Sequence, residues 1–337
     1  MISKRFVIKR LLLLIPVLLG VATFVFAILQ LSPGDPARAV AGQRASEAFV
    51  RQVRHEMGLD QPIWVQYGQF LWDTAHLDLG QSYQIRKNVP VTTILLHRLP
   101  VTVEMALYGQ LFGILFGIPL GVISAIKQDS VTDHFTRIGA LTGISIPIYW
   151  SGPLLILLFA QVLHVFPPSG RIASEYSINL VTGLITVDTL LNGNFAAFQS
   201  AAMHLILPSL VIGIYSMALI SRMMRSSMLE VVRQDYIRTA RAKGQGTKIT
   251  MLKHGFRNAL IPVVTVIGIQ FGTLLGGAVL TETVFGIPGI GTMLVKAIEA
   301  GDFPVVQGTV LTFALLFTLV NLFVDITYSY LDPRIQQ

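Results

Sequence analysis

The chain has 337 residues, of which 53% are hydrophobic and 13% are charged. Soluble domains carry roughly 25% charged residues, so this composition excludes an intrinsically disordered protein and argues against an ordinary soluble enzyme. With no cysteine, neither disulfides nor thiolate metal sites can form. The net charge of +7 lies in blocks between apolar runs, which is typical of a basic membrane face rather than of a nucleic-acid interface.

Six apolar stretches are long enough to cross a bilayer, which takes about 20 residues. They cover residues 11–31, 99–126, 138–166, 203–220, 259–284 and 304–330. The first follows a basic tail, as in a signal peptide, but its apolar run exceeds the roughly 7–15 residues of a signal peptide and no A-x-A cleavage site follows. The pattern therefore predicts an all-α integral membrane protein with six transmembrane helices.

The distribution of Lys and Arg predicts the orientation. Six spans put the N-terminal tail, residues 127–137, residues 221–258 and the C-terminus on one side, and these segments hold four, two, nine and one Lys or Arg. Because positive residues mark the cytoplasmic side, we expect both termini in the cytoplasm. Residues 32–98 hold seven on the other side, but long loops translocate largely regardless of charge.

Two long segments are expected outside. Residues 32–98 contain two stretches of helical character, 46–57 and 64–72, which should form a small folded cap. Residues 167–202 contain several prolines and glycines and form a second external lobe. Both are either packing elements or docking surfaces for another protein.

The expected organisation is the N-terminus with the first span (1–31), the cap (32–98), the second and third spans (99–166), the lobe (167–202), and the last three spans with their cytoplasmic loop (203–337).

Glycine recurs every fourth residue in two of the spans. The residues are Gly109, Gly113, Gly117 and Gly121 in the second span, and Gly268, Gly272 and Gly276 in the fifth. Such lines let helix backbones approach closely, because lipid supplies no hydrophobic drive for helix association. They predict tight helix packing, either within this chain alone or also across a subunit boundary.

Few ionisable residues lie within the apolar stretches. A carboxylate in hydrocarbon costs at least about 2.5 kcal/mol, so it should face protein or water. Glu104, Gln270 and Glu282 are candidates for a translocation path. Glu104 could equally pair with Arg98, and Asp325 fits a structural role at a helix end better than a role in a path.

The sequence lacks the common catalytic and nucleotide-binding motifs. It contains no G-x-x-x-x-G-K-[ST] and no G-x-S-x-G, and His55-Glu56 is not followed by a histidine at position 59. We therefore expect no catalytic residue, no metal site and no cofactor in this chain. The alternatives from other classes are an intramembrane protease, which would need a Ser/His or paired-Asp set in facing spans, and a membrane sensor or scaffold.

Residues 221–258 carry the strongest signal, with nine basic residues and two acids. Residues 228–243 are predicted as one helix, Gly244-Gln-Gly246 breaks it, and residues 248–256 form a second helical piece. This helix–glycine–helix segment, called the elbow below, has a shape suited to insertion into a partner's groove. The alternative is a basic loop that rests on anionic lipid headgroups.

At the elbow the sequence resembles the permeases of ATP-binding-cassette (ABC) importers, specifically the B-type subunits of the dipeptide and oligopeptide branch. The family's EAA signature corresponds to Arg238-Thr-Ala240 followed by Gly244, with arginine in place of the usual glutamate. Further matches lie at 32–36 (Ser-Pro-Gly-Asp-Pro), 78–82 (Asp-Leu-Gly-Gln-Ser), 98–104 (Arg-Leu-Pro-Val-Thr-Val-Glu), 254–262 (His-Gly-Phe-Arg-Asn-Ala-Leu-Ile-Pro), 281–291 (Thr-Glu-Thr-Val-Phe-Gly-Ile-Pro-Gly-Ile-Gly) and 331–334 (Leu-Asp-Pro-Arg). Each motif is weak alone, but the ordered set is specific.

The resemblance implies a type I ABC-importer permease fold in a bacterial inner membrane. It implies a dipeptide or short-peptide cargo, with longer oligopeptides, glutathione and nickel complexes as alternatives. The implied partners are a second homologous permease, two cytoplasmic subunits that bind ATP and Mg, and an external peptide-binding protein. By the same resemblance, the elbow residues that couple ATP hydrolysis to transport are Asp235, Tyr236, Arg238, Thr239, Ala240, Arg241 and Gly244.

Overall fold

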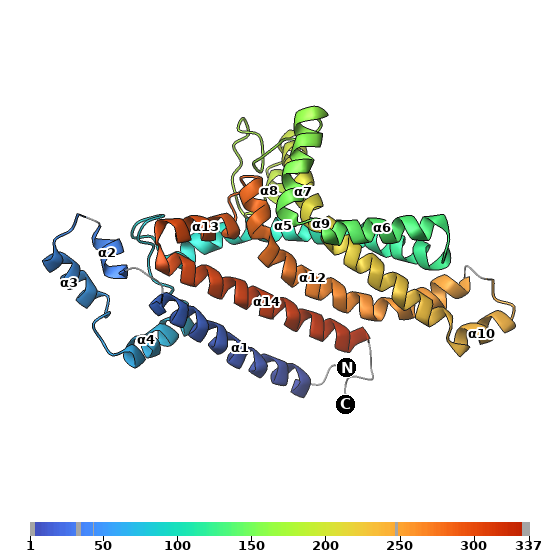
Figure 1. Ribbon diagram of the computed structural model, residues 1–337, viewed down its shortest axis with the longest axis horizontal. Coiled ribbons are helices and arrows are strands. Elements are labelled where there is room, and N and C mark those ends of the chain that lie inside the picture. The colour runs from blue at the N-terminus through green and yellow to red at the C-terminus, as the bar shows by residue number, and fades with distance from the viewer. Residues whose placement is uncertain (1–3, 32–34, 43, 247–248, 332–337) are drawn as a thin grey trace.

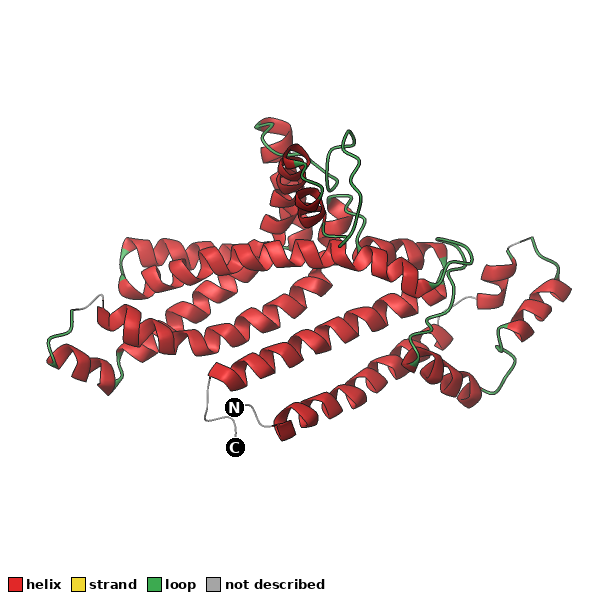
Figure 2. Ribbon diagram, turned by 180° about the vertical axis from the view of Figure 1, so that it is seen from behind, coloured by secondary structure: helices red, strands yellow, loops and turns green. Residues whose placement is uncertain are grey.

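The structure is a computed structural model that describes residues 4–31, 35–42, 44–246 and 249–331. Within these ranges the regular elements are helices (Figure 2). The longest helices run along the long axis of the molecule, with α3 near one extreme and α10 at the other (Figure 1). We call these the cap end and the elbow end. Two of the sequence motifs lie partly outside the described residues, at 32–34 and 332–334. The side chains of Arg241 and Asp325 also lie outside the described part.

Five long apolar helices and one bent pair account for the six predicted spans. The long helices are α1 (Lys4–Leu31), α5 (Val91–Ile126), α9 (Phe195–Val232), α12 (Arg257–Val284) and α14 (Phe303–Leu331). α5 has 36 residues and α9 has 38, so each is about 55 Å long, well beyond the roughly 30 Å of hydrocarbon. These helices begin before the predicted apolar stretches at 99 and 203, and α9 continues beyond 220, because hydropathy detects only the apolar part of a helix.

The third predicted span, 138–166, is not a continuous helix. It consists of α6 (Val131–Ser145), then α7 (Ile148–Leu155) and the π-helix η1 (Ile156–Val162), and the two parts meet at 105°. The bend falls at Ile146 and Pro147, which both have extended backbone angles. A residue that precedes proline is sterically driven away from helical angles, so the proline ends α6.

The cap contains the two helices predicted at 46–57 and 64–72. They are α3 (Glu47–Glu56) and α4 (Ile63–Ala75), and the short α2 (Pro36–Ala41) precedes them. Ser46 begins α3 by accepting a hydrogen bond from the amide of Phe49, as an N-cap serine does. α2 and α3 share a small core of Ala37, Val50 and Val53.

The external lobe projects with α7 from the side of the bundle (Figure 1) and contains α8 (Ile185–Leu191). The elbow consists of α10 (Asp235–Ala242) and the π-helix η2 (Thr250–Phe256), which continues directly into α12. A further helix, α13 (Ile290–Ala300), lies between α12 and α14, in a segment for which the sequence analysis made no prediction of secondary structure.

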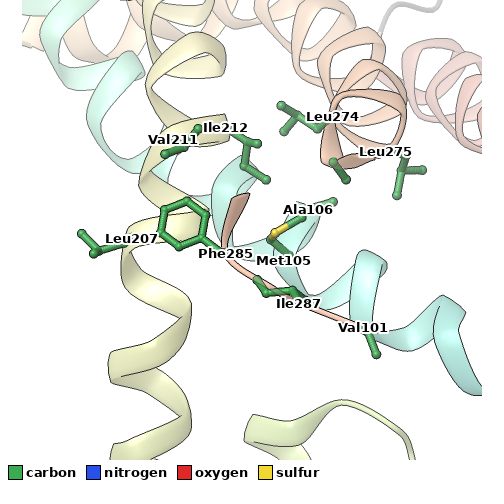
Figure 3. Close-up of a cluster of buried hydrophobic side chains, with 11 residues drawn as sticks. Val101, Met105, Ala106, Leu207, Val211, Ile212, Leu274, Leu275, Phe285 and Ile287 are labelled. Atoms are coloured by element: carbon green, nitrogen blue, oxygen red, sulfur yellow. The ribbon is translucent and has the colours of Figure 1, made fainter. Parts of the chain in front are cut away.

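The main core lies where α5, α9 and α12 meet. Figure 3 shows Met105 and Ala106 of α5 close to Leu207 and Ile212 of α9, with Phe285 wedged between these helices. Phe285 is 1% exposed. The residues that follow α12 therefore turn back into the bundle and fix the end of α12 to both other helices.

Candidate functional site

The elbow begins with a break in the helix that the sequence predicted to be continuous from 228 to 243. α9 ends at Val232, where the amide of Arg233 bonds to the carbonyls of Glu230 and Val231, and α10 starts at Asp235. The carbonyl of Gln234 accepts the first amides of the new helix. An acidic residue in the first turn stabilises a helix start through the helix dipole, so Asp235 favours two helices over one.

One face of α10 is anchored and the other is free. Ile237 is fully buried, and the hydroxyl of Tyr236 accepts a hydrogen bond of 3.0 Å from the Asn258 side chain. On the opposite face the side chains of Asp235 and Arg238 are 95% and 78% exposed and lie 3.7 Å apart. A short helix that is fixed by one buried residue and displays charged groups outward can bind a partner without unfolding.

Gly244 ends α10 in the left-handed conformation, with φ +79°. The amide of Gln245 bonds back to the carbonyl of Ala240 at 3.2 Å, as in helix endings that use a left-handed residue. A Cβ at Gly244 would meet no atom of the described residues within 4 Å. Glycine is therefore required here for its backbone angle, and the surrounding space is open.

Most of the elbow residues predicted to couple with an ATPase are accessible on α10. Asp235, Tyr236, Arg238 and Thr239 are exposed, and Ala240 is half-buried. His254 contacts Gln245 at 3.1 Å, which ties the glycine turn to η2. Since η2 continues into α12, the glycine turn is connected to α12 through this contact.

The glycines of α5 pack against α9. A Cβ at Gly113 would lie 2.7 Å from the hydroxyl of Ser216, and one at Gly117 would lie 2.8 Å from the backbone oxygen of Met217. Gly109 and Gly121 make equally close approaches to the same helix. The glycine line of the second span therefore serves packing within the chain.

The second glycine line divides between two environments. Gly268 and Gly272 approach the Val324 and Phe317 side chains of α14, whereas Gly276 has no atom of the described chain within 4 Å of its Cβ position. Gly276 instead borders a groove of about 580 Å³. The groove is lined by Ile148, Ile212, Tyr215, Gly272, Thr273, Leu274, Gly276, Gly277 and Phe317.

Gln270 is nearly buried on α12, and its side-chain oxygen has no partner in the described part of the chain. Gln110 of α5 accepts a hydrogen bond from Ser216 at 3.1 Å, while its amide nitrogen is also unpartnered there. The sequence analysis missed Gln110 and Tyr215 because a lone polar residue in a hydrophobic helix gives no indication of which side it faces.

Glu104 is 2% exposed and fixes the external lobe to α5. Its carboxylate accepts a hydrogen bond of 2.8 Å from Arg171, and bonds from the amides of Ile185 and Thr186 at the start of α8. The pair with Arg98 was wrong, because Arg98 donates to the carbonyl of Pro288 instead. A fully bonded carboxylate stabilises the lobe and has little capacity left for a passing solute.

Glu282 has a similar structural role at the end of α12. It accepts hydrogen bonds from the hydroxyl of Thr102 and, at 2.8 Å, from the amide of Thr292. A Cβ at Gly289 would collide with this carboxylate, which explains the glycine-rich motif at 281–291. In this structure Glu282 holds the start of α13 and lines neither of the two grooves described here.

A third carboxylate, Asp302, joins the cap to the start of α14. It accepts hydrogen bonds from the hydroxyl of Ser82 at 2.6 Å and from the amides of Tyr83, Gln84 and Ile85. Burial alone would raise the pKa of Asp302. The four hydrogen bonds stabilise the ionised carboxylate more strongly, so the net effect is a pKa below the usual value of 3.8. The Asp78-to-Ser82 motif therefore ends on a residue that contacts Asp302.

Asp302→Asn should lower the melting temperature by roughly 4–8 °C near pH 7, because hydrogen bonds to a charged acceptor are lost. Since the folded pKa is depressed, the stabilisation is complete above pH 3.8 and disappears as the pH falls further. The difference between the variant and the natural chain should therefore shrink below about pH 4. Melting curves between pH 3 and pH 7 test this, with the exposed Glu299→Gln as the control. A pH-independent difference would contradict it.

Comparison with known proteins identifies the family. Residues 117–337 match the binding-protein-dependent transport system inner membrane component, and residues 3–106 match the N-terminal part of such membrane components. The chain belongs to this permease family. It is 45% identical over 331 residues to the dipeptide transport system permease protein DppB of Alkalihalophilus pseudofirmus, a match that covers 98% of this chain and 99% of that protein.

Two further relatives agree with this assignment. The chain is 44% identical over 337 residues to the dipeptide transport system permease protein DppB of Escherichia coli K12, with 98% of each chain covered. It is 45% identical over 332 residues to the di/tripeptide transport system permease protein DppB of Pseudomonas aeruginosa, again with 98% of each covered. The resemblance inferred from the elbow and the ordered motifs is therefore confirmed.

The fold of this permease also matches a solved transporter. The structure described as inward-facing conformations of the MetNI methionine ABC transporter superposes with a TM-score of 0.52 at 18% identity, over 71% of this chain and 97% of that one. At this identity the match supports the fold alone. It confirms the predicted ABC-importer permease architecture.

Proposed function

We propose that this permease is the membrane-spanning subunit of an ATP-driven importer that moves dipeptides or short peptides from an external binding protein to the cytoplasm. The relatives named as dipeptide and di/tripeptide permeases, at 44–45% identity over almost the full length, support this cargo. Both termini and the elbow end would face the cytoplasm, in agreement with the excess of Lys and Arg there.

The observation that carries the mechanism is the exposed, singly anchored α10 at the elbow end. In the proposed importer, two ATPase subunits bind ATP and Mg, and one of them binds α10. Closure of the ATPases would move α10, and with it η2 and α12. A second homologous permease completes the path. This is coupling through a two-state element, and this chain contributes no catalytic group.

The groove beside Gly276 is our candidate for this chain's share of the path. Its wall combines small glycines with Tyr215 and Thr273. The hydroxyl of Thr273 donates to the carbonyl of Ile269 at 3.0 Å and can still accept a hydrogen bond from a peptide amide. The sequence offered Glu104, Gln270 and Glu282 as path residues. Among the described residues, Gln270 is the one of these three with an unpartnered side-chain atom, and it lies on α12, the helix that also contains Gly276.

Gly244→Glu should uncouple the importer. In vesicles that contain all subunits, we expect peptide uptake to fall on the order of tenfold or more while ATP hydrolysis continues, because a coupling free energy of 1–3 kcal/mol corresponds to about 5- to 150-fold. Initial rates of uptake and of phosphate release measure both quantities in the same sample.

The matched control for this variant is Gly58→Glu. Gly58 also follows a helix, has a positive φ of +66°, and has no described atom within 4 Å of its Cβ position. Unlike Gly244, it lies at the cap end. Both positions have a left-handed backbone, so a side chain strains both, but Gly58 borders the groove at the cap end and lies far from the elbow. Unchanged uptake with Gly244→Glu, or equal losses in both variants, would refute the assignment of the elbow.

The cargo is tested separately by competition. Uptake of a labelled dipeptide should be reduced by unlabelled dipeptides and tripeptides at lower concentrations than by longer oligopeptides, glutathione or nickel complexes. Stronger competition by any of these three would replace the dipeptide assignment with that alternative and leave the importer mechanism intact.

A further inference from the structure

Two neighbouring helices of the cap have opposite polarity. α3 buries Val50 and Val53 against α2 and exposes charged residues such as Arg51 and Glu56, as a helix in water does. α4 has the reverse arrangement. The exposed residues of α4 are Ile63, Trp64, Val65, Gly68, Gln69, Trp72 and Ala75, and Gln69 is the one polar side chain among them.

The polar side of α4 faces the protein. Gln66, Gln69, Asp73 and Thr74 line a groove of about 890 Å³ between α4, α1 and the cap end of α14. Trp64 and Trp72 are 73% and 67% exposed. A contiguous apolar face of this kind marks a contact with lipid or another protein, because no charge is available to keep it in water.

The contacts of α4 fix its depth relative to the membrane. The hydroxyl of Tyr67 lies 2.6 Å from that of Thr23, and Phe26 packs against Tyr67 and Phe70. Thr23 lies within the apolar span of α1, which continues to Ile28. Gln66 contacts Gln30, two residues beyond that end, so the middle of α4 lies level with the end of the apolar segment of α1.

We propose that α4 is an interfacial helix that lies in the lipid headgroup layer at the cap end, with Trp64 and Trp72 inserted into the bilayer. Tryptophan is enriched at this depth because its ring is apolar while its N–H can bond to headgroups or water. On the side of α4 that faces the protein, polar groups bond to α1. The hydroxyl of Tyr67 bonds to that of Thr23, and Gln66 accepts a hydrogen bond of 3.1 Å from Gln30. The partner of the exposed face is therefore a lipid surface.

The inference separates the cap into two parts. α2 and α3 stand in water, and α4 anchors them to the membrane beside α1. The groove behind α4 then opens at the level of the headgroups. This arrangement does not depend on which side of the membrane the cap occupies.

Nitroxide scanning tests the proposal in the assembled importer. The chain has no cysteine, so Trp64→Cys and Trp72→Cys provide unique labelling sites when the partner chains are also free of cysteine. Accessibility to oxygen, which concentrates in the bilayer, is compared with accessibility to a water-soluble nickel chelate. The reference sites are Phe24→Cys, on the exposed face of α1, and Glu47→Cys, on the exposed face of α3.

We expect both tryptophan sites to give a depth between the two references, with oxygen accessibility at least several times that at Glu47→Cys. Nickel accessibility equal to that at Glu47→Cys would place α4 in water and overturn the proposal. Protection from both reagents would show that a protein subunit covers α4, which would also overturn it. Uptake by each labelled variant confirms that the importer is assembled.

Discussion

Asp133→Asn should cause the largest loss of function among single polar substitutions in this chain. Asp133 is fully buried at the start of α6 and accepts two hydrogen bonds from Arg225 of α9, at 2.8 and 2.7 Å, together with bonds from Ser124 and the amide of Asp129. Breaking a buried ion pair from one side typically costs about 3–5 kcal/mol. We expect a fall in melting temperature of roughly 5–10 °C and loss of most peptide uptake.

The reason for the functional loss is the position of the ion pair. Arg225 lies two turns before the end of α9, and α10 follows after Arg233 and Gln234. The pair therefore fixes the helix that leads into the elbow to the N-terminus of the bent α6. Without it, movement of α10 would be absorbed locally instead of reaching the bundle.

Asp129→Asn provides the control for this prediction. Asp129 lies in the same turn and is exposed, so its amide variant should retain melting temperature and uptake. Arg225→Lys should be intermediate, because an ammonium keeps the charge but lacks the planar two-donor geometry. Normal stability and uptake in Asp133→Asn would show that the ion pair links nothing essential.

Gly117→Leu is expected to prevent correct packing of α5 on α9. Its Cβ would lie 2.8 Å from the backbone oxygen of Met217 and 3.0 Å from the Ile220 side chain. A backbone atom cannot rotate away, so the helices must separate. Overpacking typically costs about 1–3 kcal/mol, and in a helix pair that forms the centre of the bundle we expect the amount of folded protein in the membrane to fall several-fold.

Gly139→Leu is the matched control, since Gly139 is also a helical glycine but no described atom lies within 4 Å of its Cβ position. It should accumulate to normal levels. Size-exclusion profiles of the detergent-extracted chains compare the two variants directly. Equal accumulation of both would mean that the contact between α5 and α9 adjusts more easily than its geometry suggests.

The sequence by itself determined those features that depend on residues close together in the chain. Six apolar stretches predicted the membrane spans, the helical pattern over 46–57 predicted α3, and the glycines at 244 and 246 predicted a helix end there. The ordered motifs predicted the permease family, which the relatives confirmed. These signals are local, because helix formation and capping depend on neighbours within about four residues.

Only the tertiary structure decided which distant groups meet. Glu104 pairs with Arg171 rather than with nearby Arg98, and Asp302 bonds to a loop more than 200 residues earlier in the chain. The sequence likewise could not show that Glu104 holds the start of α8 and Glu282 the start of α13, or that the apolar face of α4 points away from the protein. A carboxylate or an apolar face has the same local pattern whatever covers it, so its partner is set by how the helices pack and not by the residues beside it.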